Sequence, residues 1–338
     1  MTAVLEYINM LLAGCDLSFE QSTELMDTVF SGTVEEVKIA AILTAIRIKG
    51  PTAGELAGFA RSLRSHAVKI ETGLDLLVDT CGTGGSKVKT FNISTASALV
   101  AAGAGAKIAK HGNRAITSSC GSADVLLALG VKIDCAPDRV VVCIKQANIG
   151  FMFAPMFHPA MKYVQPIRKG LGFMTVFNML GPLANPAAAS AQVLGVPDEK
   201  LMPLMIEALA LLGAKHVMVV HSAGLDEIST STPTKIFHLK AGQITQSTLD
   251  PSAFGFSAPT PDELKGSDAV TNARIVRDIV TGSETGPKRD IVILNAAAAI
   301  IVAGLADDFQ SAIDLAAASI DNGGASKCLE ILIKISNS

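Results

Sequence analysis

The chain has 338 residues, of which 49% are hydrophobic and 17% are charged, and its formal net charge is −3. Such a composition excludes a disordered chain, a collagen-like chain and a coiled coil. The small net charge provides no strongly basic surface, so we expect no nucleic-acid partner. The length suggests about two domains.

The apolar composition raises the question of a membrane segment. The uncharged stretches 291–306 and 170–197 are the best candidates. The first is shorter than the roughly 20 apolar residues that a span needs, and glycines and prolines break the second. The N-terminus lacks the basic region of a signal peptide, and the six scattered cysteines are typical of reduced thiols. We therefore expect a cytoplasmic protein with no membrane segment.

Helices are predicted for the first 70 residues, because three capping boxes each precede a helical pattern with a glycine stop. The three pairs are Ser18 with Gln21, Thr33 with Glu36, and Thr52 with Glu55. The second of these helices is expected to bury Val34, Val37, Ala41 and Ile48. Together the three predict a small helical domain.

Short apolar runs typical of buried strands alternate with helical patterns from Leu76 onward. This alternation implies an α/β domain with a mostly parallel sheet. A hairpin at the sheet edge is expected around Gly242, and two or three helices are expected from Asp290 to the end. The predicted strands are 76–78, 107–109, 131–133 and 217–220, the predicted helices 94–103 and 200–212, and the hairpin strands 236–239 and 244–249.

A glycine-rich turn, 82–86, follows the first predicted strand and leads to a hydroxyl-rich helix start, 90–95. Glycines allow backbone N–H groups to approach a phosphate closely, and a helix N-terminus adds free N–H donors. The two segments predict a cradle for a phosphate or diphosphate. An ordinary strand-to-helix turn explains this motif alone about equally well, and neither a Walker loop nor a dinucleotide fingerprint is present.

A second motif, Lys110 to Arg114, follows the next predicted strand and is succeeded by the serines of 117–122. Because parallel strands end at one edge of the sheet, this motif should lie beside the glycine turn. Two cations near hydroxyl groups suit a polyanion. The alternative is a solvated surface loop, which we favour less.

Two further motifs suit an aromatic acid and a metal. Arg168 is a planar donor for a carboxylate, and it follows the apolar segment 153–161. On its own, this motif is more typical of an amphipathic helix with a surface cation. Asp226 and Glu227 follow the strand predicted at 217–220. Paired carboxylates at a strand end suit Mg²⁺, and a charged turn is the alternative.

Taken in order, these motifs resemble the anthranilate phosphoribosyltransferase family. They read GTGG with TFNIST, KHGN with GSADVL, HPAMK, TVFNMLGPLANP and GLDEIS. The resemblance implies a nucleoside-phosphorylase-like fold and a homodimer formed through the helical domain. It also implies transfer of the phosphoribosyl group of phosphoribosyl diphosphate to anthranilate, a step of tryptophan synthesis. The implied helical domain comprises 1–70 and 160–185, and the implied α/β domain comprises 74–158 and 188–338.

The resemblance also implies which residues bind. Lys110, Asn113 and Arg168 would act by position and charge, without a clear acid or base. Mg²⁺ would be held by Ser94, Asp226 and Glu227. The remaining substrate contacts would be Gly82, Gly85, Ser86, Thr90, Asn92, Ile93, Ser94, Thr95, His111, Gly112, Arg114, Ser118, Ser122, Pro155 and His158.

The chain departs from the family pattern at two positions. Ser86 stands where the family's glycine loop usually has aspartate, and Ser119 stands where a cation is frequent. We expect retained activity with altered Mg²⁺ dependence. Two alternatives stay open: a nucleoside phosphorylase of the same fold, and a paralogue with another acceptor.

Overall fold

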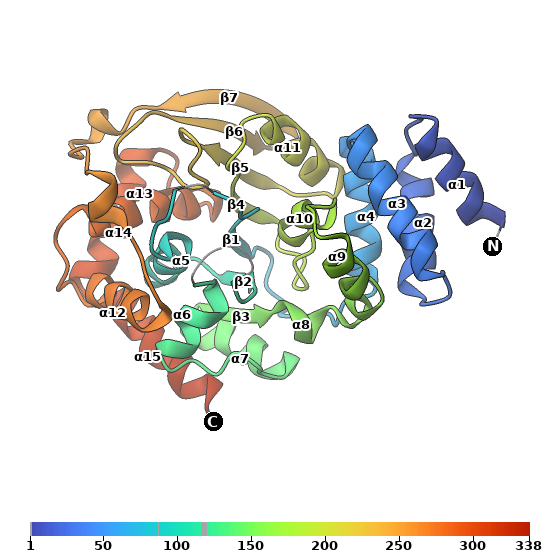
Figure 1. Ribbon diagram of the computed structural model, residues 1–338. Coiled ribbons are helices and arrows are strands. Elements are labelled where there is room, and N and C mark those ends of the chain that lie inside the picture. The colour runs from blue at the N-terminus through green and yellow to red at the C-terminus, as the bar shows by residue number, and fades with distance from the viewer. Residues whose placement is uncertain (1, 87, 116–119) are drawn as a thin grey trace.

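Four helices begin the chain and form one end of the molecule (Figure 1). The structure, a computed structural model, describes residues 2–86, 88–115 and 120–338. Both Ser18 with Gln21 and Thr52 with Glu55 form the predicted capping boxes. The helices are α1 (Thr2–Leu12), α2 (Phe19–Phe30), α3 (Glu36–Lys49) and α4 (Ala53–Ser65).

The capping box predicted for Thr33 with Glu36 is wrong. Helix α3 is preceded by Glu35, whose side chain makes no cap hydrogen bond. The hydroxyl of Thr33 instead lies 2.8 Å from the Ser31 hydroxyl. The Thr33 hydroxyl therefore has a hydrogen-bond partner in the turn before α3 and does not cap the helix.

The predicted buried face of α3 is also wrong. Val37 and Ile48 are 80% and 81% exposed. The helix is apolar around most of its circumference, so the sequence offers two stripes, and packing against α1 and α9 buries the other one. That stripe consists of Ile39, Ile42, Leu43, Ala45 and Ile46.

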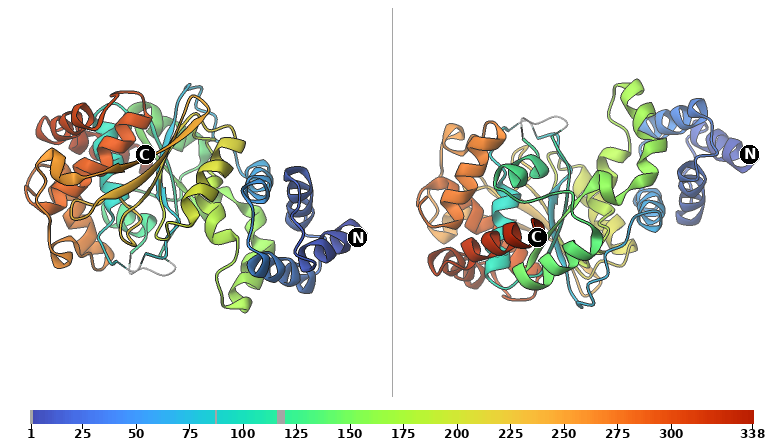
Figure 2. Two further views of the ribbon diagram at one scale, coloured as in Figure 1. Left: turned by 90° about the horizontal axis from the view of Figure 1, so that it is seen from above. Right: turned by 90° about the horizontal axis from the view of Figure 1, so that it is seen from below.

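A seven-stranded sheet in the order β3-β2-β1-β4-β5-β6-β7 forms the centre of the molecule (Figure 2). Strands β1 to β5 pair in parallel, and β5, β6 and β7 pair antiparallel. The predicted edge hairpin is confirmed, with Ala241 and Gly242 at positive φ in its two-residue turn. The strands are β1 (Val78–Gly82), β2 (Ile108–Gly112), β3 (Ile149–Phe153), β4 (Ala191–Gly195), β5 (His216–His221), β6 (Thr234–Lys240) and β7 (Gln243–Leu249).

The strand predicted at 131–133 is wrong. Val131 and Ile133 are buried, but the backbone N–H groups of this segment bond outside any ladder. Val131 donates to the Leu126 carbonyl, and Lys132 donates to the Ser336 hydroxyl. The apolar run at 131–133 thus reflects burial of these side chains in the core, not pairing in the sheet.

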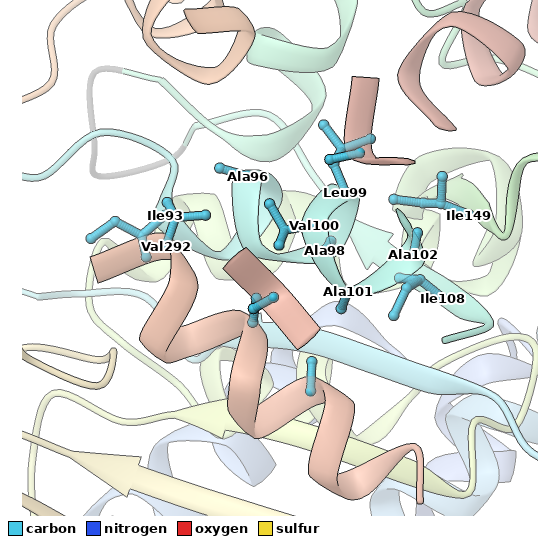
Figure 3. Close-up of a cluster of buried hydrophobic side chains, with 14 of the residues drawn as sticks. Ile93, Ala96, Ala98, Leu99, Val100, Ala101, Ala102, Ile108, Ile149 and Val292 are labelled. Atoms are coloured by element: carbon cyan, nitrogen blue, oxygen red, sulfur yellow. The ribbon is translucent and has the colours of Figure 1, made fainter. Parts of the chain in front are cut away.

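Helices cover both faces of the sheet. Helix α5 (Ile93–Gly103) follows β1 and packs with α13 (Pro287–Val302) on one face, where Figure 3 shows Leu99 and Val100 in the core with Val292. Helix α11 (Leu201–Leu211) follows β4 and packs with α4 on the other face. The order in which strands are added to the sheet thus reverses between β1 and β4. Open α/β sheets bind their ligands at such a point.

The remaining helices complete these layers. The predicted C-terminal helices are confirmed as α13 and the two that follow it. The remaining helices are α6 (Ser122–Ala128), α7 (Pro137–Ala147), α8 (Ala154–Phe157), α9 (Gln165–Leu171), α10 (Phe177–Leu180), α12 (Ala269–Val280), α14 (Phe309–Asp321) and α15 (Gly324–Ser336). The short 3₁₀ turns are η1 (Pro159–Tyr163), η2 (Gly181–Leu183), η3 (Pro251–Phe254) and η4 (Pro261–Leu264).

The segment between β3 and β4 packs against the N-terminal helices. Helix α9 contacts α3, α10 contacts α4, and η1 contacts α2. In the described part of the chain, no helix has the length and apolar character needed to cross a membrane.

Candidate active site

The carboxyl ends of β1 and β4 lie against the turn that carries Asp226 and Glu227. Gly82 and Gly195 are paired across these strands. A Cβ atom on Gly82 would lie 2.5 Å from Oδ2 of Asp226, and one on Gly195 would overlap the Asp226 carbonyl oxygen. The two glycines therefore provide the space in which Asp226 sits against the sheet.

Glu227 reaches from this turn to the start of α5. Its Oε1 accepts a hydrogen bond of 3.2 Å from the backbone N–H of Ser94. Burial raises the pKa of Glu227 to about 8, with a further increase from neighbouring Asp226 and an opposing effect of Lys110. Burial also raises the pKa of Asp226. Two adjacent half-buried carboxylates of this kind are stabilised by a cation.

The donor atoms of this turn fit Mg²⁺. The ion prefers oxygen ligands and is commonly bound by one or two carboxylates together with substrate phosphates. Asp226, Glu227 and the hydroxyl of Ser94 present oxygen donors around the β1–β4 edge. No cluster of three or more His, Cys, Asp or Glu residues suited to a metal occurs among the residues described. Substrate phosphates and water would complete the coordination of such an ion.

Lys110 is buried in the middle of β2, and its side chain extends toward the start of α5. Its Nζ donates to the Thr80 carbonyl oxygen and lies 3.4 Å from the Ser94 hydroxyl. Burial lowers the pKa of Lys110, and the carboxylate of Asp79 opposes this effect. The structure thus brings together three of the predicted features, namely the helix start, the cation and the acid pair.

Ser86, a predicted substrate contact, lies in the glycine-rich turn and is bonded to a second turn of the site. Its hydroxyl donates to the carbonyl oxygens of Val88 and Gly224, at 3.2 and 3.1 Å. These bonds tie the glycine-rich turn to the segment just before Asp226. The backbone of Gly84 and Gly85 has φ of 72° and 83°, which favours glycine, and Gly85 lies at the exposed tip of the turn.

The loop after β2 lies beside α6. Asn113 and Arg114 are exposed, and Arg114 pairs with Asp124 at 3.0 Å. The Ser122 hydroxyl lies 3.5 Å from the Asn113 carbonyl oxygen. A Cβ atom on Gly112 would overlap this hydroxyl. These contacts fix the Asn113 backbone next to the start of α6. The predicted contact Ser118 and the divergent Ser119 lie outside the described residues.

Four predicted contacts on the α5 side differ in accessibility. Asn92 bonds to the Cys120 carbonyl oxygen at 3.1 Å and so joins the two loops, while Thr90 is half-buried near them. Ile93 and Thr95 are fully buried. Their side chains therefore support α5 from the core, and a contact with a ligand would have to come from their backbone.

Uncharged histidines lie on the opposite side of the sheet from α5. The rings of His111 and His158 have centroids 5.0 Å apart. Burial lowers the pKa of His111 to about 3 and that of His158 to about 4, so both are neutral at pH 7. Pro155 is exposed on α8 in the same segment as His158.

Arg168 lies on α9, apart from the two loops. Its guanidinium stacks over Phe177 at 5.4 Å and has a 3.4 Å hydrogen bond to Gln165. Burial lowers its pKa. A half-buried cation with one long hydrogen bond retains free donors for a carboxylate.

Sequence analysis missed a hydrogen-bonding hub beneath the site. Asn185 donates to Asp79 at 2.7 Å, and the guanidinium of Arg64 donates to the Leu183 carbonyl oxygen at 2.6 Å. The available signal is one asparagine in the otherwise apolar stretch 182–189. A polar residue in such a stretch needs buried partners.

Comparison with known proteins agrees with this geometry. Residues 74–326 match the α/β domain of a glycosyl transferase family, and residues 5–67 match the helical bundle domain of that family. Anthranilate phosphoribosyltransferase of Desulfatibacillum aliphaticivorans is 47% identical over 330 residues, which cover 97% of each chain. The chain belongs to the anthranilate phosphoribosyltransferases. The family is one of pentosyltransferases in tryptophan biosynthesis.

Solved structures of other anthranilate phosphoribosyltransferases share the whole fold. The Thermus thermophilus enzyme has a TM-score of 0.93 at 38% identity and covers 100% of both chains. The Saccharomyces cerevisiae enzyme in complex with PRPP and Mg has a TM-score of 0.91 at 29% identity, covering 99% of this chain and 98% of its own. The predicted fold class, a small helical domain with a larger α/β domain, is confirmed.

Proposed function

We propose that the protein transfers the phosphoribosyl group of phosphoribosyl diphosphate to anthranilate. The bond between the anthranilate nitrogen and ribosyl C1 forms, the C1–O bond to diphosphate breaks, and the amine loses a proton to water. The observation that carries the proposal is the single site formed by Lys110, the start of α5 and the pair Asp226–Glu227. A yeast relative that binds PRPP and Mg supports it.

The donor would bind at the carboxyl edge of β1. Gly82, Gly85 and the first turn of α5 offer backbone N–H groups to phosphates, with Asn92 and Ser122 beside them. Lys110 places a fixed positive charge next to the leaving diphosphate. Mg²⁺, bound by Asp226, Glu227 and Ser94, would supply further charge neutralisation of that group.

The acceptor would bind on the side of the sheet that faces α8–α10. Arg168 would hold the carboxylate, and the neutral His111 and His158 with Pro155 would line its approach. Asn113 would align the amine. An aniline-type nitrogen is uncharged at pH 7, so orientation next to C1 contributes more than a general base.

We further propose two organisational features. The helical domain comprises 1–70 together with 160–185, a division that the packing of α9 on α3 and of α10 on α4 supports. The α/β domain then comprises 74–158 and 188–338. A homodimer forms through α1 and α3, whose exposed apolar residues are Leu5, Leu12, Val37 and Ile48. Analytical ultracentrifugation tests this assembly.

The proposed reaction is tested with purified protein, Mg²⁺, phosphoribosyl diphosphate and anthranilate. We expect anthranilate fluorescence to fall while an equal amount of diphosphate appears. Phosphorolysis of thymidine or uridine under the same conditions is the control for a nucleoside phosphorylase. No consumption of anthranilate across a wide range of Mg²⁺ concentrations would contradict the proposal.

A further inference from the structure

The segment 181–187, here called the strap, is held by side chains from several distant elements. Its first three carbonyl oxygens each accept a hydrogen bond from a different element. His111 on β2 donates to the first at 3.2 Å, Gln192 on β4 to the second at 2.8 Å, and Arg64 on α4 to the third at 2.6 Å. The strap thus joins two strands of the sheet to a helix of the N-terminal group.

Asn185 fixes the strap from within. Its Nδ2 donates to Oδ2 of Asp79 at 2.7 Å and to the Ala109 carbonyl oxygen at 2.8 Å, and its Oδ1 accepts from the Ala187 N–H at 2.9 Å. Asp79 and Asn185 are 1% and 3% exposed. Unpairing such buried groups is costly, so the strap has one well-defined position.

The strap borders the acceptor side of the proposed site. The His111 ring that bonds it also contacts the His158 ring. Helix α10, which carries Phe177 beneath Arg168, runs directly into the strap. The glycine-rich turn and α5 make no hydrogen bond to the strap among the described residues. Asn185 also bonds Asp79 and the Ala109 carbonyl oxygen next to Lys110, but both residues lie within paired strands of the sheet. A shift of the strap would therefore mainly move acceptor residues.

Arg64 is the point where the N-terminal helices hold the strap. The bond from its Nε to the Leu183 carbonyl oxygen joins residues that are 119 positions apart, and it is the side chain's single hydrogen bond within the described parts of the chain. We propose that Arg64 is a positioning residue for the acceptor, which acts by fixing the strap and, through it, His111 and Arg168. This inference rests on the proposed function.

The variants Arg64→Gln and Arg64→Lys test the inference, with Arg61→Gln as the matched control. Arg61 is exposed on the same helix, where it stacks on Phe19 at 5.2 Å. In the full-length enzyme we expect Arg64→Gln to raise the KM for anthranilate about tenfold, because small displacements of positioning groups are costly. The KM for phosphoribosyl diphosphate should stay within about twofold of wild type. Arg64→Lys keeps a donor and should fall between wild type and Arg64→Gln.

A purely structural role would lower the melting temperature and leave both KM values unchanged. An unchanged anthranilate KM in folded Arg64→Gln, with active wild type, overturns the inference. If Arg64→Gln does not fold, Arg64→Lys is judged by the same criterion. Hydrogen–deuterium exchange of the strap needs no turnover: we expect faster exchange in Arg64→Gln than in Arg61→Gln, and equal rates contradict the inference. An inactive wild type with faster exchange in Arg64→Gln would instead contradict the proposed reaction alone.

Discussion

The backbone N–H of Ser94 donates to Oε1 of Glu227 at 3.2 Å, although 133 positions separate the two residues. The bond places the carboxyl group of Glu227 at the positive end of α5, which favours its charged form and so opposes the larger effect of burial, which raises its pKa. It also aligns the acid pair with the turn that carries the predicted phosphate cradle. The proposed metal and phosphate sites would therefore form one unit.

Replacing Glu227 with glutamine should raise the Mg²⁺ concentration needed for activity. The amide keeps an oxygen for the Ser94 N–H but removes one of two adjacent carboxylates, so the charge available to the ion is halved. We expect an increase of about tenfold or more in the Mg²⁺ concentration for half-maximal rate. Initial rates at saturating substrates measure it. The exposed Glu199→Gln is the control, and equal Mg²⁺ requirements of the two variants would contradict the assignment.

The raised pKa of Glu227 makes stability depend on pH when Mg²⁺ is absent. The folded protein holds this proton up to a pKa of about 8, above the ordinary value of 4.5, so it binds more protons than the unfolded chain between these limits. Stability from this group is thus lost as pH rises. Urea unfolding in EDTA should show wild type losing stability relative to Glu227→Gln between about pH 5 and pH 8. A difference that does not vary with pH would refute this prediction.

Arg168→Ala should weaken acceptor binding. Its guanidinium has one long hydrogen bond to Gln165 and remains available for a carboxylate. Loss of a charge-assisted pair costs roughly 1.5–3 kcal/mol, which corresponds to about a 10–100-fold rise in the anthranilate KM. Steady-state kinetics at saturating phosphoribosyl diphosphate measure it. Lys169→Ala, next to it on α9 and exposed, is the control, and an unchanged KM removes Arg168 from the acceptor site.

Gly195→Ala should destabilise the protein and disturb the acid pair. The added Cβ would overlap the carbonyl oxygen of Asp226, so the turn must move. Overpacking of this kind costs about 1–3 kcal/mol. Gly170→Ala on α9, with open space around it, should be neutral or stabilising. Urea unfolding of both variants gives the comparison, and equal stability would show that the turn adapts freely.

Local signals were the most predictable part of this fold. The capping boxes at Ser18 and Thr52 depend on neighbouring residues and are found as predicted. Strands β3 and β4 went unpredicted because their sequences, IGFMF and AQVLG, carry few β-branched residues and no alternation. Their strand conformation comes from parallel pairing inside the sheet.

Part of the candidate site was predictable for the same reason. Asp226 and Glu227 lie in the turn that follows a strand predicted from the sequence, so their place at the sheet edge follows from topology. Arg64 and Asn185 were missed because their partners lie 76–119 positions away. Such pairings are properties of the assembled tertiary structure.

The hydroxyl of Ser86 closes a loop of 138 positions by bonding to the Gly224 carbonyl oxygen. The glycine-rich turn is thereby held to the acid-bearing turn before any ligand arrives. If diphosphate binds here as proposed, fewer backbone rotations are frozen on binding, which reduces the entropic cost. The uncharged side chain of Ser86 would thus contribute to diphosphate affinity by preorganising the glycine-rich turn, and not through a charge of its own.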